Sequence, residues 1–148
     1  MKILVTGGTG FIGSYMANHL HKNGHDVTIC DNNSRGVLDS FVSHLNFIEC
    51  DLTDKSQLDK LDTDYDCVYH FAAINGTENF YNIPHLVLKV NTLININILD
   101  WCVEHNIKIL STPSSNVHVS GKDSPSCRSI TSVTFILLRI ALIMSDCV

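Results

Sequence analysis

The fold of this chain is decided by residues 1–13, which read Met-Lys-Ile-Leu-Val-Thr-Gly-Gly-Thr-Gly-Phe-Ile-Gly. The apolar run at residues 3–5 is typical of a short strand that is buried on both faces of a sheet. Glycines follow at Gly7, Gly10 and Gly13, three residues apart, and a helical pattern begins after Gly13. The stretch therefore predicts a buried strand, a glycine-rich turn and a helix, in that order.

A turn of this kind is suited to the pyrophosphate of a dinucleotide. Without Cβ atoms, a glycine backbone can approach phosphate groups closely. The N-terminus of the following helix presents unpaired N–H groups and partial positive charge to an anion. The sequence therefore predicts a nucleotide cofactor at this turn, with Gly7, Gly10, Phe11, Ile12 and Gly13 as binding residues.

The composition is that of a globular protein with one well-filled interior. The chain has 148 residues, of which 45% are hydrophobic and 17% charged, and this size suggests one domain. A formal net charge of −5 and the absence of a basic run argue against a nucleic-acid partner. The longest apolar stretch, residues 133–144, contains Arg139 and is too short for a membrane span. We therefore expect neither nucleic acid nor membrane as a partner.

The six cysteines indicate free thiols rather than disulfides. No secretory leader precedes them, and three of them (Cys30, Cys50 and Cys67) fall at or near the ends of strand-like segments. No Cys-x-x-Cys pair is present, so we expect no metal site. The interpretation that follows is a cytoplasmic protein with buried thiols.

Strand-like and helix-like segments alternate along most of the chain. We expect strands over residues 2–6, 26–30, 46–50, 66–71 and 107–111, and helices over 13–22, within 52–61 and over 84–105. This alternation predicts an α/β fold with a doubly wound, Rossmann-type parallel sheet and right-handed crossovers. We expect a cofactor-binding domain over 1–120 and a divergent tail over 121–148. Periodicity does not decide whether that tail contains a closing strand or a closing helix.

An acidic residue stands where a dinucleotide-binding fold needs one. Asp31 follows Gly13 by eighteen residues, at the end of the second expected strand. A carboxylate there can accept hydrogen bonds from both hydroxyls of the adenosine ribose, and it would repel a 2′-phosphate. The residue favours NAD over NADP, although Arg35 lies close enough to make this preference less sharp.

These residues resemble the extended short-chain dehydrogenases, in particular the NAD-dependent sugar-nucleotide epimerases and dehydratases. The resemblance covers residues 1–118, and its motifs occur in the family's order. They are Thr6-Gly7-Gly8-Thr9-Gly10-Phe11-Ile12-Gly13, Asp51-Leu52, His70-Phe71-Ala72-Ala73, Asn91-Thr92 and Ser114-Ser115-Asn116-Val117-His118.

The resemblance implies a set of cofactor-binding residues. In the family the pair at Asp51-Leu52 contacts adenine, the segment at 71–73 lies against the cofactor, and the asparagine at Asn91 supports the active site. The candidate NAD-binding residues are Gly7, Gly10, Phe11, Ile12, Gly13, Asp31, Asn32, Asp51, Leu52, Phe71, Ala72, Ala73 and Asn91.

The resemblance also implies a mechanism that this sequence does not complete. In the family a tyrosine removes a proton from a sugar hydroxyl while hydride passes to NAD, and a lysine four residues later lowers the pKa of that tyrosine. Ser114 takes the position of the family's hydroxyl-binding serine. None of the four tyrosines is followed by lysine at that spacing, and His118 replaces the tyrosine of the family's Val-Tyr-Gly segment.

Three interpretations follow. The chain is an epimerase or dehydratase of nucleotide-sugars by descent (the class of UDP-glucose 4-epimerase), truncated before the substrate-binding domain and without its catalytic pair. Alternatively, it is a non-catalytic NAD-binding module that forms a homo-oligomer, or a subunit that another chain completes. The third interpretation is a non-functional remnant.

Overall fold

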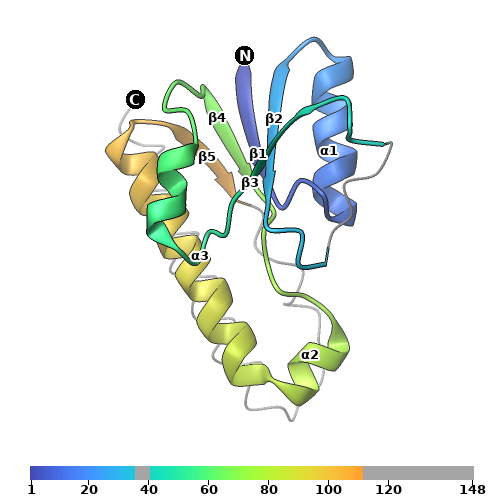
Figure 1. Ribbon diagram of the computed structural model, residues 1–148, viewed down its shortest axis with the longest axis vertical. Coiled ribbons are helices and arrows are strands. Elements are labelled where there is room, and N and C mark those ends of the chain that lie inside the picture. The colour runs from blue at the N-terminus through green and yellow to red at the C-terminus, as the bar shows by residue number, and fades with distance from the viewer. Residues whose placement is uncertain (36–40, 112–148) are drawn as a thin grey trace.

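The computed structural model describes residues 1–35 and 41–111. Its centre is a five-stranded parallel sheet with the strand order β3-β2-β1-β4-β5 (Figure 1). The strands are β1 (Lys2–Thr6), β2 (Asp26–Asp31), β3 (Asn46–Glu49), β4 (Cys67–His70) and β5 (Lys108–Ser111). The predicted doubly wound sheet is confirmed, and the five strands lie where the sequence places them to within one or two residues.

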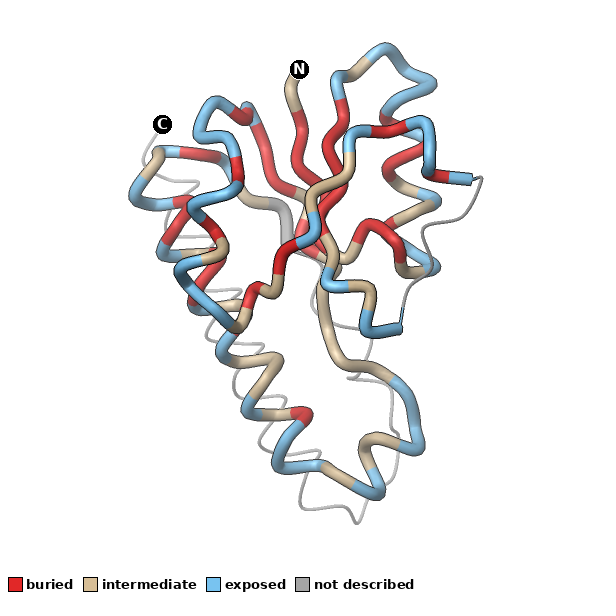
Figure 2. The backbone as a smooth tube through the Cα atoms, in the orientation of Figure 1, coloured by how far each residue is buried: buried red, intermediate tan, exposed pale blue. Residues whose placement is uncertain are grey.

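Helices cover both faces of this sheet. They are α1 (Phe11–Lys22), the 3₁₀ helix η1 (Lys55–Lys60), α2 (Thr77–Asn82) and α3 (Pro84–Glu104). Side chains alternate along β1, so that Ile3 and Val5 pack toward α1 while Leu4 packs toward α3. Figure 2 shows that the buried residues gather in the strands and in the helix faces turned toward them.

Two helical segments differ from the sequence-based expectation. The segment expected as a short helix within 52–61 is the 3₁₀ helix η1, and the Asp54 carboxylate caps it by accepting from the Ser56 N–H. The helix α2 is not expected from the sequence, because none of its six residues is buried and they carry no apolar periodicity.

The helix α3 is long and apolar enough, by length and composition alone, to cross a membrane. It is the one such helix in the part of the chain that the structure describes, and the sequence analysis does not anticipate it. One face of it is nevertheless in the core, where Ile94, Ile98, Trp101 and Cys102 are buried against the sheet. Such packing is typical of a core helix in a Rossmann-type domain.

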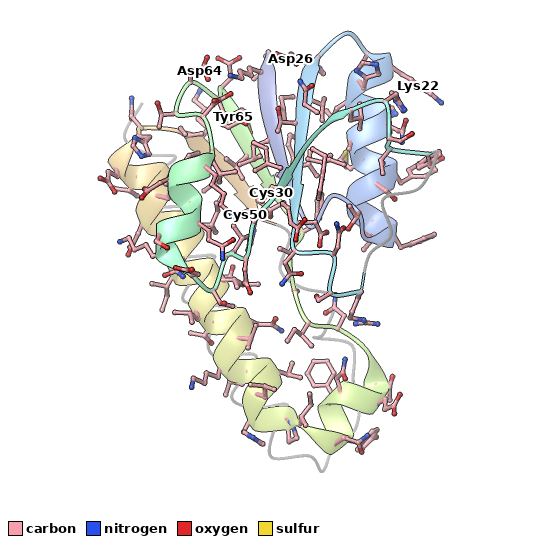
Figure 3. All side chains as sticks on the ribbon, in the orientation of Figure 1. Lys22, Asp26, Cys30, Cys50, Asp64 and Tyr65 are labelled. Atoms are coloured by element: carbon pink, nitrogen blue, oxygen red, sulfur yellow. The ribbon has the colours of Figure 1, made fainter. Side chains whose placement is uncertain are left out.

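The amino edge of the sheet carries a cluster of charges. Lys2 Nζ lies 2.8 Å from an Asp62 oxygen and 2.5 Å from an Asp64 oxygen, and 5.0 Å from the centre of the Tyr65 ring. Hydrogen bonds to Asp62 and then to Asp64 raise the pKa of Lys2 above its usual range. Figure 3 shows Asp64 and Tyr65 at this edge, opposite to the edge where the strands end.

The glycine turn joins β1 to α1 through backbone contacts that leave no space for side chains. A Cβ atom on Gly13 would lie 2.0 Å from the Gly7 carbonyl oxygen, and one on Gly8 would lie 2.5 Å from Cβ of Ile29. Gly7 has a φ of +70°, and its Cβ would lie 2.7 Å from the Ala72 nitrogen. Gly10 differs from these, because a Cβ there would meet only the Gly7 carbonyl oxygen at 3.2 Å. The turn is therefore closed at Gly7, Gly8 and Gly13 and less tightly packed at Gly10.

We predict that Gly13→Ala destabilises the fold by about 3 kcal/mol, because the helix must move away from the turn to accommodate the methyl group. Gly10→Ala is the matched control and should change the free energy of unfolding by much less. Urea unfolding of the two variants and the unchanged chain measures the difference. Equal unfolding midpoints for Gly13→Ala and the unchanged chain would contradict the close packing described above.

Candidate functional site

The candidate site lies at the carboxyl edge of the sheet. The strands β1, β2 and β4 end there at Thr6, Asp31 and His70. β1 lies between β2 and β4, and the helices that follow β1 and β4 cover opposite faces (Figure 1). This is the switch point of the sheet, where parallel α/β proteins bind their ligands in a crevice.

The N-terminus of α1 opens onto this edge. Gly10 is its N-cap, no side chain caps it, and its first turn contains no acidic residue. The first N–H groups of a helix have no intrahelical acceptor, so those of Phe11, Ile12 and Gly13 can bind an anion. The structure therefore brings together the five turn residues that the sequence singles out.

Asp31 joins the glycine turn to the loop after β2. One carboxylate oxygen accepts from the Thr9 N–H at 3.1 Å, and the other accepts from the Asn33 N–H at 2.9 Å. Asn32 is exposed beside it, and its side-chain oxygen accepts from the Ser34 N–H. These bonds fix the Asp31 carboxylate half-buried at the rim of the turn, where a ribose can reach it.

Asp51 and Leu52 lie beside Asp31 because the Cys50 N–H donates to the Asp31 carbonyl oxygen at 3.1 Å. One oxygen of the Asp51 carboxylate accepts from both the N–H and the hydroxyl of Thr53. Leu52 is buried, and its carbonyl accepts from the Asn97 side chain of α3 at 2.8 Å. The sequence analysis did not identify Asn97, which holds this segment in place.

The segment after β4 lies against the glycine turn. The Phe71 N–H donates to the Thr6 carbonyl at 3.0 Å, and the Ala72 backbone faces Gly7. Asn91 on α3 bonds both backbone groups of Ile74, accepting from its N–H at 2.8 Å and donating to its carbonyl at 3.0 Å. Both polar atoms of the Asn91 amide thus form hydrogen bonds with the loop after β4, so Asn91 positions that loop.

Several buried polar atoms at this edge lack a hydrogen-bond partner among the described residues. They are Thr9 Oγ1, Asn33 Oδ1, His70 Nε2 and Asn75 Oδ1. Buried polar atoms without partners are rare in folded proteins and often indicate an absent ligand or water. A dinucleotide, with its ribose hydroxyls and phosphates, has groups that could pair with such atoms, so the site fits one. Thr9 and His70 lie in quoted motifs, but Asn33 and Asn75 were not singled out from the sequence, because isolated asparagines carry no periodic signal.

His70 and Thr6 form a buried pair at the ends of β4 and β1. The Thr6 hydroxyl lies 2.6 Å from Nδ1 of His70. Burial lowers the pKa of His70 to about 4, so its imidazole is neutral at neutral pH. A neutral imidazole holds the two strand ends together without placing a cation in the core.

The cysteines that the structure describes are free thiols. Cys30, Cys50, Cys67 and Cys102 are all buried and unpaired, as the sequence analysis expects. Cys30 and Cys50 lie close together at the end of β2 and just after β3 (Figure 3). A hydrogen bond to Cys50, together with burial, raises the pKa of Cys30 well above its ordinary value. Within residues 1–35 and 41–111, no three histidine, cysteine or acidic side chains form a metal-binding group.

Ser114 and His118, as well as the tail expected over 121–148, lie outside the described residues. The catalytic role that the resemblance gives to Ser114 therefore stays a prediction.

We predict that acid weakens this fold through His70. The unfolded histidine takes up a proton as the pH falls through about 6.5, whereas the folded one resists protonation until about 4. Stability should therefore be full above pH 6.5 and fall by about 3 kcal/mol toward pH 4. Thermal unfolding of the unchanged chain and of His70→Asn over this range measures the effect.

The variant His70→Asn should lose most of this pH dependence, although it will be less stable at neutral pH. His19→Asn, which removes an exposed histidine of α1, is the matched control and should keep the dependence. The same slope in the His70→Asn variant and in the unchanged chain would contradict the assignment.

Comparison with known proteins identifies relatives of this chain. The model of the NAD-dependent epimerase/dehydratase family matches residues 3–134. The UDP-N-acetyl-alpha-D-glucosaminuronate decarboxylase of Bacillus cytotoxicus is 32% identical over 127 residues, which cover 84% of this chain and 39% of that protein. The UDP-glucose 4-epimerase of Corynebacterium glutamicum is 34% identical over 110 residues, which cover 74% of this chain and 33% of that protein.

Solved structures show the same fold. The UDP-glucose 4-epimerase of Bifidobacterium longum, in complex with NAD+ and UDP, matches with a TM-score of 0.82 at 21% identity. That match covers 97% of this chain and 50% of the solved chain. The present chain thus spans half of that structure and less than half of the two curated relatives. Since the family model covers most of its residues, this chain belongs to the NAD-dependent epimerase/dehydratase family.

Proposed function

We propose that this chain binds NAD as the cofactor module of a nucleotide-sugar epimerase, dehydratase or decarboxylase, and that it is catalytically incomplete as it stands. The observation that carries the proposal is the glycine turn, which has no Cβ atom at Gly7, Gly10 and Gly13 and is followed by a helix N-terminus that no side chain caps. Membership of the family, and relatives solved with NAD, support the choice of cofactor.

In this proposal, different residues at the carboxyl edge bind different parts of the cofactor. The backbone of residues 7–13 holds the pyrophosphate, and the Asp31 carboxylate accepts from the adenosine ribose. Asn32 borders that ribose, and Asp51 with Leu52 lies at the adenine. The segment 71–73 lies along the cofactor, and Asn91 keeps that segment in place. When bound, NAD supplies a hydride acceptor, and the chain supplies orientation and electrostatics.

The chain's own residues do not provide the acid–base pair that turnover needs. An unperturbed tyrosine has a pKa near 10 and is a poor base at neutral pH without a nearby cation. None of the four tyrosines is followed by a lysine four residues later. In the proposal Ser114 keeps its hydroxyl-binding role, and the tyrosine and lysine come from outside these 148 residues, for example from a completing subunit.

Relatives' names indicate the class of substrate. The curated relatives above are named for reactions on UDP-sugars, so we propose a nucleotide-sugar as the substrate of the complete enzyme. The domain would comprise residues 1–120, with 121–148 as a divergent tail. The free buried thiols support a cytoplasmic location.

We predict that the purified chain binds NAD and that Gly10→Ala weakens this binding more than tenfold, because a methyl group would occupy the space that a phosphate needs. Isothermal titration calorimetry gives both dissociation constants, and thermal unfolding without ligand verifies that the variant is folded. Gly24→Asn, at an exposed turn far from the site, is a control for the loss of a glycine, because asparagine tolerates the positive φ of +82° at this position. A folded, unchanged chain that gives no binding heat with NAD at millimolar concentration would contradict the proposal.

We also predict that the chain alone does not turn over UDP-glucose in the presence of NAD, because the catalytic pair is absent. Chromatography of the nucleotide-sugars after prolonged incubation detects any UDP-galactose formed. A full-length UDP-glucose 4-epimerase serves as the positive control. Product above background in the sample that contains only this chain would show that other residues supply the acid–base chemistry.

A further inference from the structure

Arg35 connects the two loops on either side of the glycine turn. Its side chain begins in the loop after β2, and its Nη1 donates to the Asn75 carbonyl in the loop after β4. The guanidinium also lies over Gly76, where a Cβ atom would be 3.5 Å from Nη2. The side chain is exposed, and its other N–H groups have no hydrogen-bond partner in the part of the chain that the structure describes.

The contact between Arg35 and Asn75 crosses the carboxyl edge of the sheet in front of β1. β1 lies between β2 and β4, so a side chain that starts after β2 and ends at the loop after β4 lies across the opening in front of β1. The glycine turn and the N-terminus of α1 follow β1 at that same edge. The guanidinium is therefore carried away from Asp31, toward the side of the site where the turn would seat a pyrophosphate.

Arg35 differs from the other described lysines and arginines in its position near this opening. Among the described residues of the loops that follow β1, β2 and β4, it is the only lysine or arginine. The remaining described cations lie elsewhere: Lys2, Lys22 and Lys108 at the amino edge or the last turn of α1, and Lys55, Lys60 and Lys89 on η1 and α3. Within these described loops, Arg35 is thus the one lysine or arginine near a pyrophosphate bound at the turn.

We propose that Arg35 ligates the pyrophosphate of the bound dinucleotide, and that it exchanges the Asn75 carbonyl for a phosphate oxygen when the cofactor binds. A guanidinium forms stronger hydrogen bonds with an anionic phosphate than with a neutral carbonyl, so the exchange favours the bound state. This proposal rests on the proposed function and adds to it a residue that determines how tightly the dinucleotide binds.

The pyrophosphate is favoured over a 2′-phosphate for two reasons. Asp31 stands at the end of β2, where the adenosine ribose would lie, and its negative charge repels a phosphate on that ribose. The Arg35 guanidinium is hydrogen-bonded on the opposite side of the turn, to the loop after β4. Arg35 should thus strengthen the binding of NAD without creating a preference for NADP.

Calorimetric titration of the full chain with NAD, NADP and adenosine tests this proposal, using Arg35→Ala, Arg35→Lys and the control Lys22→Ala. The control removes one positive charge at the other end of α1, where the side chain is exposed. We expect Arg35→Ala to weaken NAD binding about tenfold, Arg35→Lys to weaken it less, and Lys22→Ala to leave it unchanged. Adenosine, which has no phosphate, should bind the unchanged chain and Arg35→Ala equally. Added salt should weaken NAD binding less in Arg35→Ala than in the unchanged chain.

The titrations separate failure of the Arg35 proposal from failure of the proposed function. If the unchanged chain binds NAD and Arg35→Ala binds it equally well, the role of Arg35 is refuted while the proposed function stands. Equal losses for NAD and adenosine would mean that Arg35 only shapes the loops, which also refutes phosphate binding. A preference of the unchanged chain for NADP that disappears in Arg35→Ala would assign Arg35 to the 2′-phosphate instead. If a folded, unchanged chain binds no NAD, the proposed function fails, and this inference fails with it.

Discussion

The structure depends on the close approach of Gly13 to the carbonyl of Gly7, with no Cβ between them. This contact sets the distance between the start of α1 and the end of β1. Because α1 then packs through Ala17 and Leu20 on one face of the sheet, its N-terminus is fixed at the carboxyl edge. In the proposed function, backbone packing therefore forms the anion site, and Arg35 adds one charged side chain to it.

Neighbouring loops are held to this turn by hydrogen bonds from three side chains, of which Asp31 is also proposed to bind the ribose. Asn91 holds the loop after β4, Asn97 holds the segment after β3, and the Asp31 carboxylate ties the loop after β2 to Thr9. Two of these three residues lie on α3, so the long helix acts as a rigid support for the site. Buried amides that satisfy backbone groups in this way keep loops in one conformation.

The sequence was sufficient to predict the sheet and the turn because both are encoded locally. Buried parallel strands appear as apolar runs, and the glycine spacing is specific enough to identify the turn. The roles of Asn97 and of the bridge from Arg35 to Asn75 could not be predicted, because each joins residues about forty positions apart. The helix α2 was missed for a different reason, since a short exposed helix leaves no periodic pattern.

The central claim is that backbone N–H groups at the start of α1 receive the pyrophosphate of NAD. A titration of the isotopically labelled chain with NAD, followed by amide resonances in two-dimensional NMR spectra, tests it most directly. The account predicts large shifts for the amides of residues 10–13 and little change for Asp64 at the amino edge. Saturating NAD that leaves the amides of residues 10–13 unmoved, or shifts confined to α3, would contradict it.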